Sequence, residues 1–302
     1  MSLAVSYSRF GGPEVLQVIE VEEPHAAPGQ VRIAVRAAGL NPYDYKVRRG
    51  DYGDRRFPSM QGFEFAGVVD EVGDGVVGDG VVGWKPGDAV LGFSATAAQA
   101  EYVVVPATNI AAKPEALDWA VAGGIGLVGN AARRSVDALS LGAGDTVLVT
   151  AAAGGVGLLA TQFALAAGAA VVGTASDKNH DFIRSLGAMP VAYGDGQIER
   201  LREAAPQGFT AMLDNAGEVA LGIDLGIPLD RINSIVDFDT AGIGTVGGGR
   251  KNAAELEKLA EAAASGAIVF PILAQYPLAA VADAYARLEQ RSGLGKIVLT
   301  VP

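Results

Sequence analysis

The chain has 302 residues, half of them hydrophobic, with 41 glycines, no cysteine and a formal net charge of −11. This length predicts roughly two domains, the acidic balance argues against nucleic acid as a partner, and the missing cysteine excludes disulfides, thiol nucleophiles and cysteine-ligated zinc. Because no apolar run reaches the roughly 18 residues of a membrane span and residues 1–10 lack a signal-peptide pattern, we expect a cytoplasmic protein.

Residues 1–115 have the pattern of a β-rich domain. Apolar or alternating stretches separated by glycine and proline predict strands at residues 15–21, 30–38, 64–72, 89–92 and 100–106. A tandem duplication, Gly73-Asp-Gly-Val-Val77 followed by Gly78-Asp-Gly-Val-Val82, lies between two of these strands. We interpret it as a lengthened surface loop without a functional role, because surface loops tolerate insertions.

The pattern changes after Leu117. Small-residue helices alternate with short apolar strands, which we place at residues 146–151, 170–174, 190–193, 210–214 and 232–236. Such alternation predicts parallel βαβ units with right-handed crossovers. An amphipathic helix at 278–290 and a closing strand at 296–301 lie outside these units, and we expect them to return to the first domain.

The segment from Thr146 to Gly157 is the most informative motif. A β-branched strand leads into Ala151-Ala-Ala-Gly-Gly-Val-Gly157, and a helix is expected over Leu158–Ala167. Such a turn presents backbone N–H groups and a helix dipole to a pyrophosphate. It matches the dinucleotide fingerprint Gly-x-Gly-x-x-Gly except at the first position, which is alanine. The alternative is a tight turn without a ligand. The residues expected to bind the pyrophosphate are Ala153, Gly154, Gly155 and Val156.

The second predicted strand of this region indicates which dinucleotide binds. Enzymes that use NAD carry an acidic residue about 20 residues after the fingerprint, where it binds the ribose 2′-hydroxyl. Here Ala175 or Ser176 occupies this place, followed by Asp177 and Lys178. A hydroxyl and an ammonium group suit a 2′-phosphate, so we predict NADPH. The alternatives are a helix N-cap for Ser176 and a solvated side chain for Lys178.

Six motifs in order carry a resemblance that covers nearly the whole chain. They are Gly39–Asp44, Gly62–Gly73, Trp84–Val90, Ala151–Gly157, Arg184–Ala188 and Gly293–Val298. The chain resembles the zinc-free medium-chain dehydrogenase/reductases of the quinone oxidoreductase (zeta-crystallin-like) type. The resemblance implies an α/β fold, with a GroES-like β-rich catalytic domain of residues 1–115 and 271–302. It also implies a Rossmann NADPH-binding domain, a doubly wound parallel sheet, at residues 116–270.

The chain departs from the zinc-dependent relatives in a way that bears on its chemistry. Those relatives place a cysteine near Asn41 and a histidine near Phe63, and this chain has neither. Its two histidines, His25 and His180, lie at no sensible zinc spacing. We therefore expect no metal. Alcohol oxidation loses its usual stabilisation without a Lewis acid, whereas a quinone or an α,β-unsaturated carbonyl already accepts hydride readily.

The resemblance also implies roles for residues 41–52. It places Asn41 and Asp44 near the nicotinamide and the substrate carbonyl. Tyr52 matches a proposed proton donor of 2-enoyl-thioester reductases, and a phenol of pKa about 10 can protonate a developing enolate. The alternatives are an aromatic lid contact for Tyr52 and a turn-forming side chain for Asp44.

Further cofactor contacts follow from the same resemblance. We expect Tyr193 beside the 2′-phosphate, Asn215 and Ala216 near the ribose, and Arg291 at the cofactor, with a solvated helix end as the alternative for Arg291. One departure affects the nicotinamide. The family's Gly-Leu-Thr-Ala-Tyr stretch reads Gly129-Asn-Ala-Ala-Arg133 here, so Ala131 replaces the threonine.

Two other functions stay open at this point. A 2-enoyl-thioester reductase would use Tyr52 as its proton donor and basic residues for the phosphate of coenzyme A, and four arginines near Tyr52 are candidates: Arg48, Arg49, Arg55 and Arg56. A solvated loop is the alternative for these arginines. The missing threonine leaves a non-catalytic NADPH-binding sensor open. A strand at Ile268–Phe270 resembles the family's dimer-forming edge, so we expect a homodimer.

Overall fold

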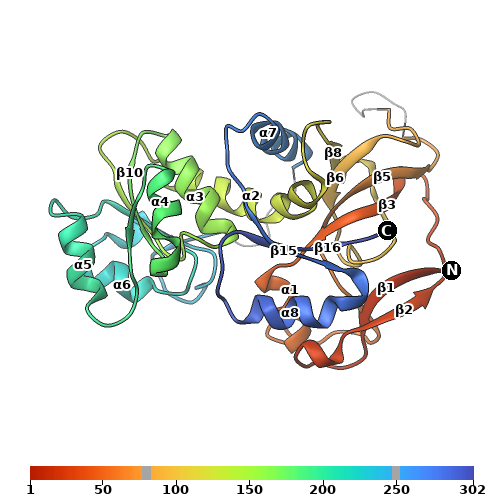
Figure 1. The fold of residues 1–302 in the computed structure, drawn as a ribbon, viewed down its shortest axis with the longest axis horizontal. Helices are drawn as coiled ribbons and strands as arrows, with labels where there is room; N and C mark the ends of the chain where they lie inside the picture. The colour runs from red at the N-terminus through yellow and green to blue at the C-terminus, as the bar shows by residue number, and fades with distance from the viewer. Residues whose placement is uncertain (77–82, 247–251) are drawn as a thin grey trace. The chain divides into compact units, whose positions relative to one another are not determined.

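The computed structural model describes residues 1–76, 83–246 and 252–302. The whole second copy of the duplication, Gly78–Val82, and Val77 of the first copy therefore lie outside the described residues. The chain divides into two compact units (Figure 1). Unit 1 comprises Met1–Leu127, Lys251–Ser292 and Lys296–Pro302, and unit 2 comprises Val128–Arg250 and Gly293–Gly295.

The part of unit 1 that the structure describes is built on two β-sheets. The smaller sheet has the order β2 (Gln17–Val21), β1 (Ser2–Tyr7), β4 (Ser59–Met60). The larger sheet has the order β15 (Ile272–Pro277), β16 (Lys296–Thr300), β3 (Gln30–Gly39), β5 (Glu64–Val72), β6 (Ala89–Phe93), β8 (Ile110–Ala112), and β7 (Tyr102–Pro106) also pairs with β3. Because β16 pairs antiparallel with β3, the C-terminal tail belongs to the N-terminal sheet (Figure 1).

The core of unit 1 follows from the alternation of side chains along β3. Val31, Ile33 and Val35 are buried on one face, as expected for a strand whose two faces have different surroundings. The tail adds Tyr285 and Leu299 to the same apolar core. The helices of this unit are α1 (Pro42–Arg49), the first part of α2 (Trp119–Leu139), α7 (Ala253–Ala264) and α8 (Val281–Glu289).

Helix α1 carries the first predicted site residues, and its ends are set by local sequence. Pro42 occupies the first turn, where a missing N–H costs nothing. The backbone N–H of Asn41 donates to Oδ2 of Asp44 at 2.7 Å, which satisfies one donor at the start of the helix. Gly50 ends the helix in the left-handed conformation that glycine adopts most easily.

The described residues of unit 2 form one parallel sheet of six strands. Their order is β11 (Met189–Val191), β10 (Ala170–Thr174), β9 (Thr146–Val149), β12 (Ala211–Asp214), β13 (Ile232–Ser234), β14 (Gly244–Thr245). The order reverses between β9 and β12, which is where doubly wound sheets bind dinucleotides. The helices are α3 (Gly155–Ala166), α4 (His180–Ser185), α5 (Gln197–Ala204) and α6 (Val219–Asp224). The predicted α/β fold class is confirmed.

Short 3-10 helices complete the described chain. They are η1 (Pro13–Val15), η2 (Ala107–Asn109), η3 (Asp177–Asn179), η4 (Leu229–Arg231) and η5 (Leu278–Ala280). Within the described ranges no helix is long and apolar enough to cross a membrane.

Three details differ from the sequence predictions. The strand expected at Ile268–Phe270 is wrong: these residues form no strand, and Ile268 and Phe270 are apolar because they are buried. Five strands were not predicted: β1, β4, β8, β14 and β15. The compact units divide at residues 127/128, whereas the domain boundary predicted from the sequence is 115/116. The reason is that the start of α2 packs on unit 1, where a Cβ at Gly126 would touch Phe93 and Leu256.

Candidate active site

In unit 1, Asn41 belongs to a closed group of buried polar side chains. Its Oδ1 accepts a hydrogen bond from Nζ of Lys296 at 2.5 Å, and its Nδ2 donates to Oε1 of Glu64 at 2.8 Å. Lys296 and Glu64 also form an ion pair at 2.8 Å, and their side chains are 4% and 1% exposed. The N–H of Leu127 donates to the other oxygen of Glu64 at 2.7 Å. We call Asn41, Glu64 and Lys296 the Asn41 cluster.

Asp44 lies beside this cluster and is fully buried. Its Oδ2 accepts hydrogen bonds from the N–H of Asn41 at 2.7 Å and the hydroxyl of Tyr285 at 2.9 Å. Its Oδ1 has no partner among the described residues. Burial raises the pKa of Asp44 from 3.8 to about 7, against the opposing effects of its two hydrogen bonds and of Lys296. Asp44 can therefore hold or release a proton near neutral pH.

Tyr285 connects Asp44 to the interior of unit 1. Its hydroxyl accepts a hydrogen bond from Nε2 of Gln99 at 2.7 Å. Burial and the neighbouring Asp44 raise the pKa of Tyr285 well above its usual value, so its phenol stays protonated and donates to Asp44. The buried guanidinium of Arg48 lies 4.8 Å from the centre of the Tyr285 ring.

Tyr52 has a different environment. Its side chain is 51% exposed, and its ring lies 5.2 Å from the ring of Tyr43, which in turn lies 4.9 Å from Phe63. Partial burial, followed by the neighbouring Tyr43, raises the pKa of Tyr52. The structure therefore brings Asn41 and Asp44 together and leaves Tyr52 in a separate aromatic group.

The first two arginines after Asp44, Arg48 and Arg49, already form ion pairs within unit 1. Arg48 donates to Oε1 of Glu289 at 2.5 Å, and Arg49 binds the other oxygen of the same carboxylate. Arg48 is also completely buried. Two of the four arginines proposed to bind coenzyme A are thus already neutralised by one carboxylate. Arg291 donates to the hydroxyl of Tyr45 at 3.2 Å.

In unit 2, the turn between β9 and α3 has the features that a pyrophosphate needs. Helix α3 begins at Gly155, three residues before the predicted start, and Gly154 is its N-cap. The N–H groups of the first turn have no acceptor within the helix and point out of its N-terminus. A Cβ at Gly157 would overlap the carbonyl oxygen of Ala151, so glycine is required where the helix meets the strand. The N–H of Gly295 closes the turn by donating to the oxygen of Ala153 at 2.9 Å.

The residues predicted to select the cofactor lie after β10 and β11. Ser176 precedes η3 but its hydroxyl does not cap it, and it instead accepts a hydrogen bond from Nδ2 of Asn179 at 3.2 Å. Lys178 is exposed and forms no ion pair with any described residue. Tyr193 is 47% exposed. The carboxyl end of β10 therefore carries a hydroxyl and a free ammonium group, which fit a 2′-phosphate.

The carboxyl end of β12 is organised by a buried aspartate. Asp214 accepts hydrogen bonds from the hydroxyls of Thr150 at 3.0 Å and Ser234 at 2.6 Å, and from the N–H of Ala216 at 3.1 Å. The side chain of Asn215 donates to the carbonyl oxygen of Thr150 at 3.0 Å. These bonds fix the ends of β9, β12 and β13 at the reversal point of the sheet, the usual dinucleotide position.

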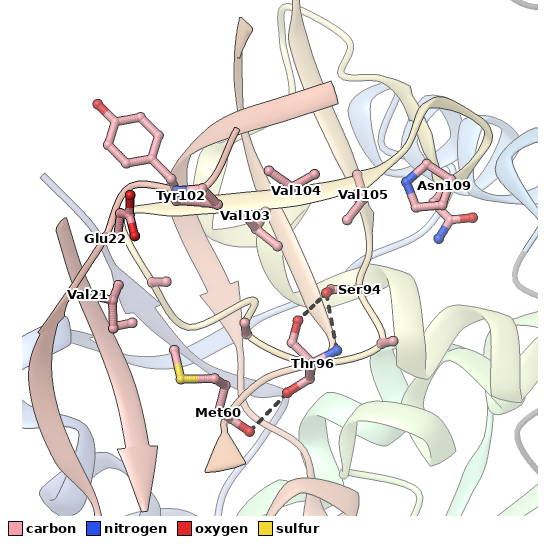
Figure 2. Close-up of a pocket in the computed structure, with 16 residues that line it drawn as sticks. Val21, Glu22, Met60, Ser94, Thr96, Tyr102, Val103, Val104, Val105 and Asn109 are labelled. Carbon is pink, nitrogen blue, oxygen red and sulfur yellow. Dashed lines mark hydrogen bonds between the residues drawn. The ribbon is translucent and has the colours of Figure 1, made fainter. Parts of the chain in front are cut away.

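Unit 1 also contains a cavity of about 510 Å³. Figure 2 shows that Val103 and Val105 of β7, Val21 and Met60 surround it with apolar groups. The turn below them is held by a hydrogen bond from the hydroxyl of Thr96 to the carbonyl oxygen of Met60 at 3.0 Å. None of the predicted site residues lines this cavity.

Sequence reasoning missed the residues that organise these sites, above all Glu64, Lys296, Tyr285 and Asp214. A usable signal existed for two of them. Glu64 and Lys296 are charged residues within apolar strand segments, and a charge buried in a sheet needs an opposite charge nearby. No group of three or more histidine, aspartate or glutamate side chains within the described part of the chain is placed to hold a metal ion.

Comparison with known proteins agrees with this architecture. Residues 27–115 match the alcohol dehydrogenase GroES-like domain, and residues 186–299 match the zinc-binding dehydrogenase family. The chain is 31% identical to the NADPH-dependent alkenal/one oxidoreductase of Arabidopsis thaliana, over 97% of this chain and 78% of that protein. The chain belongs to the quinone oxidoreductase family of the medium-chain dehydrogenase/reductases.

Other members of the quinone oxidoreductase family are similar over their whole length. The quinone oxidoreductase of Lama guanicoe is 29% identical, with 98% of this chain and 96% of the relative covered. The structure of the quinone oxidoreductase from Coxiella burnetii superimposes with a TM-score of 0.85 at 29% identity, over 100% and 99% of the two chains. The Escherichia coli quinone oxidoreductase complexed with NADPH gives 0.85 at 26% identity, over 99% of each chain. The resemblance predicted from the sequence is thus confirmed.

Proposed function

We propose that this protein is an NADPH-dependent oxidoreductase that transfers a hydride to a quinone or an α,β-unsaturated carbonyl without using a metal. The observation that carries the proposal is the combination, in unit 2, of a turn suited to a phosphate with Ser176 and with Lys178, an exposed lysine that pairs with no described residue. The names of the relatives, an NADPH-dependent alkenal/one oxidoreductase and several quinone oxidoreductases, support the same chemistry.

The residues of unit 2 fit the cofactor at both of its phosphate positions. The backbone of Ala153–Val156 would bind the pyrophosphate through N–H groups at the start of α3. Ser176 and Lys178 would bind the 2′-phosphate, with Tyr193 beside them, and Asn215 and Ala216 would lie at the ribose. When bound, NADPH supplies the hydride.

The residues of unit 1 would supply a proton to the substrate and stabilise the negative charge on its oxygen. Reduction of a carbonyl-conjugated bond leaves negative charge on the substrate oxygen, and donors aimed at this oxygen lower the barrier. The amide of Asn41 is the donor we propose. Tyr52, which is about half exposed, is the proposed proton donor, and Asp44 is the buried acid that holds the start of α1 in place. Arg291 is proposed to contact the cofactor.

The thioester-reductase alternative loses its main structural support. It requires free basic side chains for the phosphates of coenzyme A, yet Arg48 and Arg49 share the carboxylate of Glu289. Arg55 and Arg56 alone remain for that role. We therefore place simple quinones and enones ahead of acyl thioesters as substrates.

Steady-state oxidation of NADPH tests the proposal. The acceptors are 1,4-benzoquinone, an alkyl enone, 2-hexenal and crotonyl-CoA, and NADH serves as the control cofactor. We expect turnover of a quinone or an enone with NADPH that clearly exceeds turnover with NADH. Tight NADPH binding without turnover of any acceptor would favour a sensor and contradict the proposal. A clear preference for crotonyl-CoA would favour the thioester reductase.

The remaining expectations belong to the same proposal. They are a cytoplasmic location, a homodimer, and a nucleotide-binding domain at residues 116–270 within a catalytic domain of residues 1–115 and 271–302. Only the similarity to the family now supports the expectation of a homodimer, because residues 268–270 form no strand. Sedimentation equilibrium measures it directly, and a monomeric mass would contradict it.

A further inference from the structure

We propose that Glu64 and Lys296 are positioning residues that fix the orientation of the Asn41 amide toward the substrate oxygen. This inference rests on the proposed function, because it assigns Asn41 a task in that reaction. It concerns two residues, Glu64 and Lys296, that lie within the motifs Gly62–Gly73 and Gly293–Val298 but to which the sequence analysis assigned no role.

The hydrogen-bonding chemistry of the cluster allows only one amide orientation. An ammonium group can only donate, and a carboxylate can only accept. Oδ1 of Asn41 therefore faces Nζ of Lys296 at 2.5 Å, and Nδ2 faces Oε1 of Glu64 at 2.8 Å. A rotated amide would set two donors against each other on one side and two acceptors on the other. The ion pair thus selects the orientation of Asn41.

Counting donors and acceptors in the Asn41 cluster shows which hydrogen-bonding group remains available to a ligand. Nδ2 of Asn41 has two N–H groups, and one of them is used by Glu64. The carboxylate of Glu64 is engaged on both oxygens, because the N–H of Leu127 donates to Oε2 at 2.7 Å. The second N–H of Asn41 has no acceptor among the residues that the structure describes. Such a donor on a fixed amide suits an oxygen that gains negative charge.

Neighbouring glycines leave the space that the charged side chains of Glu64 and Lys296 occupy. A Cβ at Gly39 would overlap the carboxylate of Glu64, and a Cβ at Gly124 would come within 2.9 Å of Cγ of Lys296. Glu64 lies on β5, Lys296 on β16, Asn41 before α1 and Leu127 on α2. The carboxylate of Glu64 therefore links its own strand to β16, α2 and the residue before α1, and the amide of Asn41 is held by contacts from several parts of unit 1.

The alternative is a purely structural ion pair, and a set of variants separates the two roles. Lys296→Met leaves the carboxylate of Glu64 buried without its counter-charge and should destabilise unit 1. The double variant Glu64→Gln/Lys296→Met removes both charges and should regain most of that stability. Lys296→Arg keeps the charge and the donors. Lys113→Met removes a partly buried lysine elsewhere in unit 1 and is the matched control.

Four measurements are made on each variant: unfolding by urea, NADPH affinity, kcat with a quinone or enone, and the side-chain amide NMR signal of Asn41. The signal is assigned by its loss in Asn41→Asp. We expect Lys296→Met and the double variant to lose roughly ten- to hundredfold in kcat, as misplaced catalytic groups do. NADPH affinity should stay unchanged, Lys296→Arg should recover part of kcat, and Lys113→Met should behave as wild type.

A double variant that recovers kcat together with its stability would show that the pair is only structural and overturn the inference. If wild type reduces no acceptor, the proposed function fails, and the NMR signal still decides the positioning role. That signal must shift and broaden in the double variant, because the amide is then free to rotate. An unchanged signal overturns the inference.

Discussion

At the scale of single residues, the most unusual group is the carboxyl of Asp44. It is fully buried, one of its oxygens has no partner among the described residues, and its pKa is raised from 3.8 to about 7. The folded protein therefore holds this proton more tightly than the unfolded chain does. The stability that results is fully present below about pH 4 and is lost as the pH rises toward about 7.

This linkage predicts a pH dependence that Asp44→Asn removes. The unfolding free energy of wild type relative to Asp44→Asn should fall by an amount on the order of 2–4 kcal/mol between about pH 4 and pH 8. Urea denaturation across this range measures it. The variant Asp54→Asn, which changes an exposed carboxyl of the same unit, should track the wild type. Parallel curves for wild type and Asp44→Asn would show that Asp44 titrates normally.

Tyr52 gives a second prediction at this scale. An enolate needs a proton donor, and general acids contribute roughly 10²- to 10⁴-fold, whereas a quinone needs little acid help once it has received a hydride. Tyr52→Phe should therefore slow enone turnover by about 100-fold and leave quinone turnover nearly unchanged. Tyr43→Phe, which changes the neighbouring ring, is the control. Equal losses with both acceptors would assign Tyr52 a role in packing.

At the scale of elements, substitutions at two glycines of the turn before α3 should affect folding and cofactor binding differently. A methyl group at Gly157 would overlap backbone atoms of Ala151 and Ala152, so Gly157→Ala should destabilise the protein by roughly 1–3 kcal/mol. At Gly154 the nearest atom to an added Cβ is the oxygen of Ala151 at 3.3 Å. Gly154→Ala should therefore destabilise the protein much less than Gly157→Ala but weaken NADPH binding, because the methyl group would occupy the proposed approach of the pyrophosphate.

Thermal unfolding and NADPH titration of both variants check this contrast. The result that contradicts it is normal NADPH affinity in Gly154→Ala, which would place the pyrophosphate away from this turn.

The loop after β10 gives another prediction. Lys178 is exposed and unpaired by any described residue, so its removal changes no internal contact. Lys178→Ala should weaken NADPH binding about tenfold, the loss of one charged hydrogen bond, and leave NADH binding unchanged. The surface variant Lys258→Ala is the control. An equal change for both cofactors would mean that Lys178 does not contact the 2′-phosphate.

Elements were predictable where the local pattern and the tertiary structure agree. Strand β5 occupies the predicted residues 64–72, because its middle, Phe65–Val69, is apolar and the strand is central in its sheet. Strand β15 contains a glutamine and ends in proline, and it forms only through parallel pairing with β16, which includes a register shift. The segment at 268–270 has a strand-like composition, but its apolar side chains serve core packing instead.

At the scale of the whole molecule, the fold was predictable from motifs and the polar clusters were not. The βαβ alternation and the turn at Gly154 fix the Rossmann sheet from sequence alone. The Asn41 cluster instead depends on residues 41, 64 and 296, which only the pairing of β16 with β3 and of β3 with β5 brings together. A single sequence shows that Lys296 is charged but does not show which carboxylate it meets.

Transfer of deuterium from cofactor to product tests the central claim most directly. NADPH carrying deuterium at the transferable C4 position is incubated with the protein, a metal chelator and the best enone of the acceptor panel. The saturated product is then analysed by mass spectrometry and NMR. We predict one deuterium per product molecule, on the carbon β to the carbonyl, with no effect of the chelator. A product without deuterium, or NADPH that binds and is never oxidised, would contradict the assignment of this chain as a metal-independent NADPH-dependent reductase.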